Sequence, residues 1–99
     1  MASLTIALTD GFTGQAVVVR VDGRVVLDEE RVRTRPQIGL AREIAVPVGD
    51  SAQHTVAVIL PADGIEGSLT VDAAVTPAVL VAVREGAIEM RTADRTRYL

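Results

Sequence analysis

The 99-residue chain contains no cysteine, lysine, asparagine or tryptophan, and His54 is its single histidine. Without cysteine it has no disulfide, no thiolate nucleophile and no cysteine-based metal site, although a cysteine-free domain folds in any redox compartment. Without lysine it has no Schiff-base amine and no phosphate-binding Walker lysine. These absences exclude several catalytic classes.

Basic charge is also in short supply. The ten basic residues, all arginine, are outnumbered by 13 acidic residues, and the formal net charge is −3. Proteins that track a phosphate backbone usually have an excess of arginine and lysine on one face. We therefore expect no nucleic-acid partner.

Aromatic side chains and long apolar runs are equally scarce. Phe12 and Tyr98 make up the 2% aromatic share, so the 48% hydrophobic share must pack mainly through valine, alanine, leucine and isoleucine. No apolar run reaches 18 residues, and Met1-Ala2-Ser3 enters a strand pattern rather than a signal peptide. We expect a soluble, cytoplasmic protein with no membrane partner; a processed secreted domain given a new start methionine would look the same.

What the sequence does contain is a valine-rich alternation of apolar and polar residues, the period of a half-buried strand. It predicts about eight short strands, over residues 3–9, 16–21, 24–32, 44–48, 53–60, 66–74, 77–84 and 87–92. Such spacing without a helix is typical of an all-β antiparallel sandwich, Ig-like or jelly-roll-like, or of a small barrel. We expect one sandwich domain over residues 1–92 and a polar tail over 93–99.

Turn residues separate the expected strands. Asp22-Gly23 fits a two-residue type I′ hairpin, because both central residues of that turn need a positive φ. Glu85-Gly86 ends another pair of strands, and the segment 61–64, Pro-Ala-Asp-Gly, suits a longer turn. Pro47 lacks an N–H and places its strand at a sheet edge.

The two tight hairpins differ in their outer faces. At Glu85-Gly86, two-residue register pairs Val83 with Ile88 on the core face. It pairs Val81 with Met90 on the same face. The opposite face should be largely solvent-exposed, with the residues Leu80, Ala82, Arg84, Glu89 and Arg91.

At Asp22-Gly23 the same register pairs Val19 with Val26 on one face. The other face is apolar in its middle too, and a small sandwich normally buries only one face of each sheet. A covering loop over 33–43, a contact with another chain and simple exposure are the alternatives. Our hypothesis is a contact with another chain through four residues: Val18, Arg20, Val25 and Leu27.

His54 is the one side chain that titrates near neutrality without perturbation. With Ser51 and Asp50 it would form a Ser-His-Asp hydrolase site, but residues this close in sequence rarely adopt that geometry and no nucleophile elbow is present. His54 is also in phase with Val56 and Val58, which places it at the margin of the core. We assign no catalytic residue.

Charged residues near the loops suggest two ligand classes. Calcium would need carboxylates from several turns, and the candidates are Asp10, Asp22, Asp50, Asp63 and Asp72, without an EF-hand spacing. Arg31, Arg33 and Arg35 alternate, so they would share one side of an extended segment and bind an anion, a sugar acid or a phosphate. Neutralisation by the preceding acids 28–30, or a charged edge that prevents aggregation, is the alternative. We assign no metal and no cofactor.

Sugar-binding modules commonly stack a pyranose ring on an exposed aromatic side chain, and only Phe12 and Tyr98 are available for this. Phe12 lies in a loop flanked by glycines, where it would be exposed or would plug the end of the sandwich.

The segment 19–26, Val-Arg-Val-Asp-Gly-Arg-Val-Val, followed by Gly49 and by His-Thr-Val-Ala-Val over 54–58, resembles the PEGA-type bacterial β-sandwich modules. Those modules have a Val-Asp-Gly hairpin and then a Gly-x-His strand entry, whereas four residues separate Gly49 from His54 here. The resemblance implies a non-enzymatic sandwich that contacts proteins or the cell envelope, and it transfers no functional residue.

The sequence therefore favours a non-enzymatic binding or assembly module that acts through protein–protein contacts and self-associates. A carbohydrate-binding or small-ligand-binding sandwich is the first alternative, and a small hydrolase that uses His54 is the second.

Overall fold

The alternating segments form strands close to the expected ranges in a computed structural model, which describes residues 2–49, 53–73 and 77–93. The described strands are β1 (Ala2–Leu8), β2 (Thr13–Val21), β3 (Arg24–Arg33), β4 (Arg42–Val48), β5 (Gln53–Leu60), β6 (Ile65–Asp72), β7 (Ala78–Arg84) and β8 (Ala87–Ala93). β8 thus continues one residue past the expected domain limit at 92.

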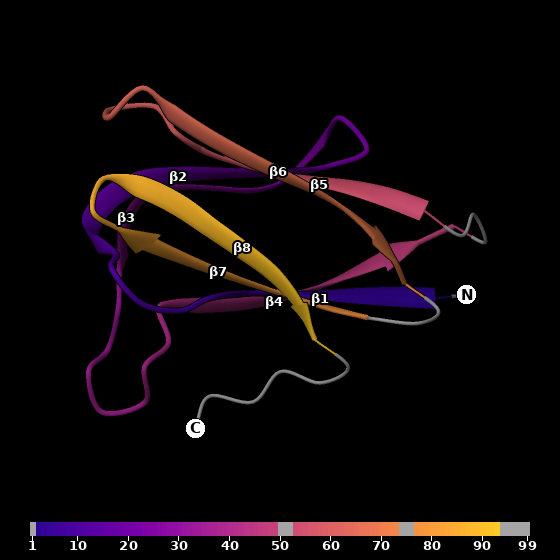
Figure 1. Ribbon diagram of the computed structural model, residues 1–99, viewed down its shortest axis with the longest axis horizontal. Helices are drawn as coiled ribbons and strands as arrows, with labels where there is room; N and C mark the ends of the chain where they lie inside the picture. The colour runs from indigo at the N-terminus through magenta and orange to yellow at the C-terminus, as the bar shows by residue number, and fades with distance from the viewer. Residues whose placement is uncertain (1, 50–52, 74–76, 94–99) are drawn as a thin grey trace.

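The strands form two stacked four-stranded sheets, with sheet B above sheet A in the view of Figure 1. Sheet A has the order β4-β1-β7-β8, and sheet B has the order β3-β2-β5-β6. The expected all-β sandwich is confirmed. Most described neighbours are antiparallel, but β1 and β7 run parallel, which the sequence analysis did not anticipate. They are not joined by a hairpin, because the chain passes through five other strands between them, so no tight turn fixes their relative direction.

The core lies between the sheets and is built by the period-2 pattern. In β2 the inward residues Val17 and Val19 are fully buried, and in β5 Val56 and Val58 are fully buried. The facing sheet contributes side chains of equal burial from β1 and β7: Leu4, Ile6, Leu8, Val79 and Val81. Aliphatic side chains of similar size therefore fill a core that holds one described aromatic residue, Phe12.

Phe12 plugs the end of the sandwich and is only 2% exposed. Its N–H donates to Oγ1 of Thr34 (3.1 Å), and its carbonyl oxygen accepts from the N–H of Thr34 (2.7 Å). These bonds join the β1–β2 connection to the end of β3. Of the two alternatives for Phe12, the buried one holds, because a large apolar ring gains more from filling the end of the core than from solvent exposure. Tyr98 lies outside the described residues.

The type I′ turn expected at Asp22-Gly23 is confirmed, and the turn at Glu85-Gly86 has the same pair of positive φ angles. The φ angles are 53° and 84° at Asp22 and Gly23, and 52° and 75° at Glu85 and Gly86. The position of Pro47 is confirmed as well, because β4 is an edge strand that pairs with β1.

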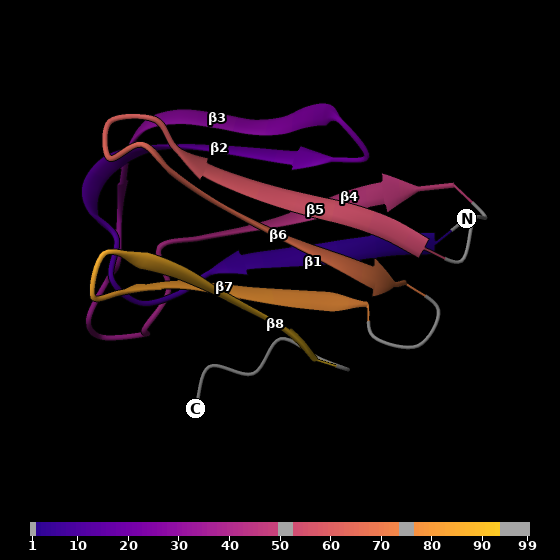
Figure 2. The same ribbon diagram turned by 45° about the horizontal axis from the view of Figure 1, so that its top comes forward.

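The two long sides of the sandwich differ. On one side β6 and β8 approach closely at Gly67, where an added Cβ would lie 3.0 Å from Cγ2 of Ile88. On the other side the edge strands β3 and β4 are joined by the 34–41 segment, which passes from sheet B to sheet A (Figures 1 and 2).

The β7–β8 hairpin has the expected register, with Val83 opposite Ile88 and Val81 opposite Met90. Its outer face is less solvated than expected, since Leu80 is only 7% exposed. β7 is an interior strand of sheet A, with β1 on one side and β8 on the other, so side chains of both neighbours reduce the solvent exposure of the residues on its outer face.

Within residues 2–49, 53–73 and 77–93 there is no helix long and apolar enough to cross a membrane.

Candidate functional site

The register of the β2–β3 hairpin differs from the expected one. Arg20 lies opposite Val25 as predicted, but the next pair is Val19 with Leu27, because a β-bulge accommodates Val26 as an extra residue. Leu27 therefore faces the core and is only 7% exposed. Its assignment to an interface was wrong, since one extra residue moves the residues directly after it to the opposite face.

The other three predicted interface residues lie together on the outer face of sheet B. Val25 is 49% exposed, Val18 is half-buried and Arg20 is exposed. Two partly buried residues of β5 join them, because Ile59 pairs with Val18 and Ala57 pairs with Arg20. We call this surface the outer patch; its residues are Val18, Arg20, Val25, Ala57 and Ile59.

Sequence reasoning missed the two β5 residues of the outer patch. Hairpin register relates only strands that are adjacent in sequence, whereas β2 and β5 are separated by two strands along the chain. The available signal was that Ala57 and Ile59 are apolar at the outward positions of β5. The acidic residues Asp28 and Glu66 border the patch, opposite Val18 and Ile59 respectively.

His54 is a buried residue at the core margin, 4% exposed, as its phase with the β5 valines predicted. Its Nδ1 lies 2.7 Å from Oδ2 of Asp22 in the β2–β3 turn. Because an ionised carboxylate only accepts hydrogen bonds, Nδ1 has the proton in this pair. Oδ1 of the same carboxylate accepts from the N–H of Thr55 (2.9 Å), whose carbonyl oxygen accepts from the N–H of Asp22 (2.8 Å).

These three contacts fasten the β2–β3 turn to the start of β5. The pKa of Asp22 is lowered from its ordinary value of 3.8. The largest cause is the hydrogen bond from His54, and the next is the backbone hydrogen bond from Thr55. We call Asp22, His54 and Thr55 the turn clamp. The expected partners of a His54 hydrolase, Asp50 and Ser51, lie outside the described residues. Only 4% of the His54 residue is exposed.

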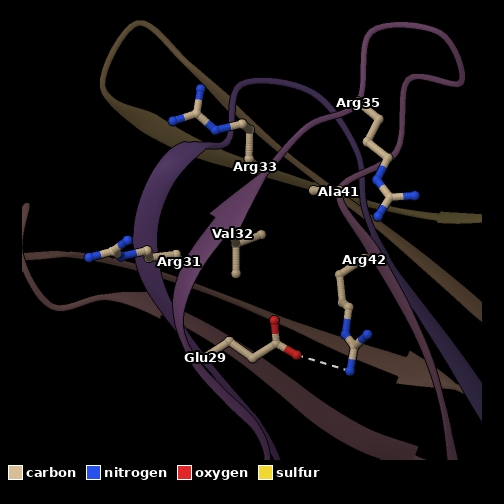
Figure 3. Close-up of a pocket in the computed structure, with 7 residues that line it drawn as sticks. All are labelled: Glu29, Arg31, Val32, Arg33, Arg35, Ala41 and Arg42. Atoms are coloured by element: carbon tan, nitrogen blue, oxygen red, sulfur yellow. Dashed lines mark ion pairs between the residues drawn. The ribbon is translucent and has the colours of Figure 1, made fainter.

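A hollow of about 310 Å³ lies beside the β3 edge, between β3 and the start of β4. Its lining includes Val32 and Ala41, together with the charged residues Glu29, Arg31, Arg33, Arg35 and Arg42. We call it the arginine hollow. Figure 3 shows the guanidinium groups of Arg35 and Arg42 on the β4 side, and those of Arg31 and Arg33 extending away on the opposite side of β3. The three alternating arginines therefore do not share one side, because the chain leaves the strand after Arg33.

The sequence offered the acids 28–30 as residues that neutralise Arg31, Arg33 and Arg35, but the ion pair that forms here joins one of these acids to an arginine of another strand. Glu29 pairs with Arg42 of β4 at 2.9 Å, across the gap between the sheets. Within the described part of the chain, Arg31, Arg33 and Arg35 form no ion pair. The Arg33 guanidinium instead lies over Gly14 of β2, with Nη2 3.2 Å from where a Cβ would lie.

Nowhere in the described ranges do three or more histidine, aspartate or glutamate side chains gather to hold a metal ion. One of the calcium candidates, Asp50, lies outside those ranges.

Fold and surfaces together define an all-β sandwich with two candidate contact regions, the outer patch and the arginine hollow. The chain matches no protein-family model, no curated protein and no solved structure. The resemblance to PEGA-type modules stays a prediction.

Proposed function

We propose that the protein is a non-enzymatic binding and assembly module that self-associates through the outer patch of sheet B. The observation behind this proposal is a group of partly exposed apolar side chains on one face of three neighbouring strands: Val18 on β2 lies opposite Ile59 on β5, and Val25 on β3 lies in the adjacent row, opposite Arg20. A contiguous apolar surface on a sheet face, rimmed by charge, is typical of a protein contact.

The charges around the patch suit a second copy of the same chain. Arg20 lies in the interior of the patch, while Asp28 and Glu66 lie at its two edges. A two-fold axis through the patch brings the arginine of one copy toward an acidic edge of the other, so the surface is complementary to itself.

The size of the face indicates a weak dimer. Four strands about 4.8 Å apart and seven residues long, at about 3.3 Å per residue, give a face of roughly 20 by 23 Å, on the order of 500 Å². A standard stable interface buries about 800 Å² on each partner. We therefore expect reversible association, with a dissociation constant in the micromolar range.

Sedimentation velocity over a concentration series from low to high micromolar tests the proposal. The wild-type chain should shift from monomer to dimer, and Val25→Asp should weaken the dimer at least tenfold, because it places a carboxylate in the apolar contact. Ile38→Asp is the matched control, since Ile38 has the same exposure (51% against 49%) but lies outside the patch. It should leave the dissociation constant unchanged.

Charge reversal provides a second test of the same surface. Arg20→Glu should weaken the dimer, and added salt should weaken the wild-type dimer but not that of Arg20→Glu. A chain that stays monomeric at the highest concentration, or a dimer that Val25→Asp and Ile38→Asp weaken equally, contradicts self-association through this patch.

The proposal agrees with what the PEGA-type resemblance implies, a non-enzymatic Ig-like sandwich that works through contacts with proteins.

A further inference from the structure

We propose that the arginine hollow between β3 and β4 binds a small phosphate-bearing anion. The hollow lies on the open edge of the sandwich, is separate from the outer patch, and shares no residue with it.

The first argument is charge. Four of the ten arginines of a chain with a net charge of −3 line this one hollow, against a single acid, Glu29. Glu29 neutralises Arg42, and among the described residues no ion pair neutralises the other three arginines. Such a concentration of one sign in a concave site attracts counter-ions.

The second argument is the chemistry of the donors. Arg35 and Arg42 extend toward the same side of the hollow from two different segments (Figure 3). Guanidinium groups donate paired N–H bonds that match the oxygen spacing of phosphates and carboxylates. Arg31 and Arg33 also line the hollow, but their guanidinium groups extend away on the opposite side of β3, so they add positive potential rather than direct hydrogen bonds. Three uncompensated charges favour an anion with two or more negative charges, such as a phosphate group, over a monocarboxylate.

The third argument is size. A volume of about 310 Å³ lies at the lower end of the range of ligand pockets. It holds a phosphate group and a few further atoms, whereas a polymer would need a longer groove. Val32 is buried at the side of the hollow and Ala41 is half-buried beside it, so an apolar part of the ligand has a surface to contact.

Glu29 regulates this site in the proposed arrangement. Its carboxylate lies 2.9 Å from Nη2 of Arg42, so a bound anion must compete with it for that guanidinium. Removing the carboxylate charge frees Arg42. The proposal therefore predicts that loss of an acid at position 29 tightens anion binding.

Isothermal titration calorimetry with pyrophosphate, and with inorganic phosphate in a separate arm, tests the proposal. Wild-type protein should bind pyrophosphate. Arg35→Gln should weaken binding about tenfold, through loss of a hydrogen bond to a charged group. Glu29→Gln should strengthen binding severalfold.

The Arg84–Glu89 pair supplies matched controls, because its atoms lie 2.8 Å apart on the β7–β8 hairpin and neither residue lines the hollow. Arg84→Gln and Glu89→Gln make the same changes of net charge as Arg35→Gln and Glu29→Gln. They should leave the affinity for pyrophosphate within about twofold of wild type, because only a weak, screened long-range electrostatic interaction with the ligand changes. Circular dichroism of each variant confirms that it is folded.

Three results would overturn the proposal: no heat of binding with either phosphate probe, equal effects of the hollow variants and their controls, or tighter binding of citrate than of pyrophosphate, which would assign the hollow to polycarboxylates. Because no outer-patch residue is changed, failure here leaves the self-association proposal intact.

Discussion

The turn clamp gives the sharpest test of the structure, because the chain contains two type I′ turns that differ in one respect. Asp22 and Glu85 occupy equivalent positions with φ angles of 53° and 52°. The Asp22 carboxylate binds His54 and Thr55, whereas Glu85 is exposed at the tip of its hairpin. Asparagine is among the residues best suited to a positive φ. Asp22→Asn and Glu85→Asn therefore place the same favourable turn residue in two different surroundings.

The expected effects have opposite signs. At position 85 asparagine relieves left-handed strain and should raise the free energy of unfolding by roughly 0.5–1 kcal/mol. At position 22 the amide has one acceptor oxygen in place of two: it can still accept from the Thr55 N–H, but its NH2 then faces the protonated Nδ1 of His54. The charge-assisted character of both hydrogen bonds is lost, at about 1 kcal/mol for each bond. The Asp22 side chain is 50% exposed, so solvent screening reduces the total. We expect Asp22→Asn to lower the free energy of unfolding by about 1 kcal/mol, which corresponds to a fall in Tm of roughly 4–8 °C.

The pH dependence separates the clamp from a general effect of the substitution. The pKa of Asp22 is lowered in the folded protein, so its ionised form stabilises the fold. That contribution is fully present above the ordinary value of 3.8 and is lost as the pH falls through the lowered folded value. The stability difference between wild type and Asp22→Asn should therefore shrink as the pH falls below about 3.8.

Urea unfolding followed by far-ultraviolet circular dichroism is the suitable assay, because the chain has no tryptophan. Glu85→Asn serves as the control for the turn. A rise or no change in stability for Asp22→Asn, or a difference that stays constant down to pH 2, would refute the reasoning.

Three further substitutions test the packing. Gly11→Ala should destabilise by at least about 3 kcal/mol, because the new Cβ would overlap the carbonyl oxygen of Val83 at a φ of +88°. Gly49→Ala, whose new Cβ would have no described atom within 4 Å, should be neutral in the same thermal melt. Gly67→Ala should cost about 1 kcal/mol in urea unfolding, since its Cβ would press on Ile88, and an unchanged midpoint would contradict the close approach of β6 and β8. Leu27→Asp should abolish cooperative unfolding, because it places a carboxylate in the core. The outer-patch variant Val25→Asp should lower the free energy of unfolding by less than about 1 kcal/mol. Similar losses of stability for the two variants would contradict the bulge at Val26.

The difference between Leu27 and His54 shows where sequence reasoning succeeds and where it fails. Both predictions extended an alternation along a strand. The alternation holds through β5, so His54 faces the core as expected. In β3 the bulge at Val26, one of three register shifts between β2 and β3, reverses the phase at Leu27, and nothing in the residues 24–27 distinguishes a regular strand from a bulged one. Two valines and a leucine suit either face, so packing across the core decides between them.

The residues of the two candidate surfaces also divide into those that the sequence could place and those that needed the tertiary structure. Val18, Arg20 and Val25 could be placed on the outer patch because adjacent strands share a turn, but Ala57 and Ile59 required the pairing of β2 with β5. Arg31, Arg33 and Arg35 were visible as a local pattern. Their proximity to Arg42, and the pairing of Glu29 with that residue, depend on how the two sheets are placed at their open edge.

The sequence by itself determined the elements of this protein: the strands, because apolar alternation has the period of a pleat; the type I′ turn at Asp22-Gly23, because aspartate and glycine tolerate positive φ; and the edge position of Pro47, which has no N–H to donate. Tertiary structure decided what non-adjacent elements do to one another. The bulge at Val26, the parallel pairing of β1 with β7, the turn clamp and the arginine hollow each join segments that are distant in sequence or depend on packing against them. Local propensity acts over a few residues, whereas these contacts depend on the free energy of packing two whole sheets.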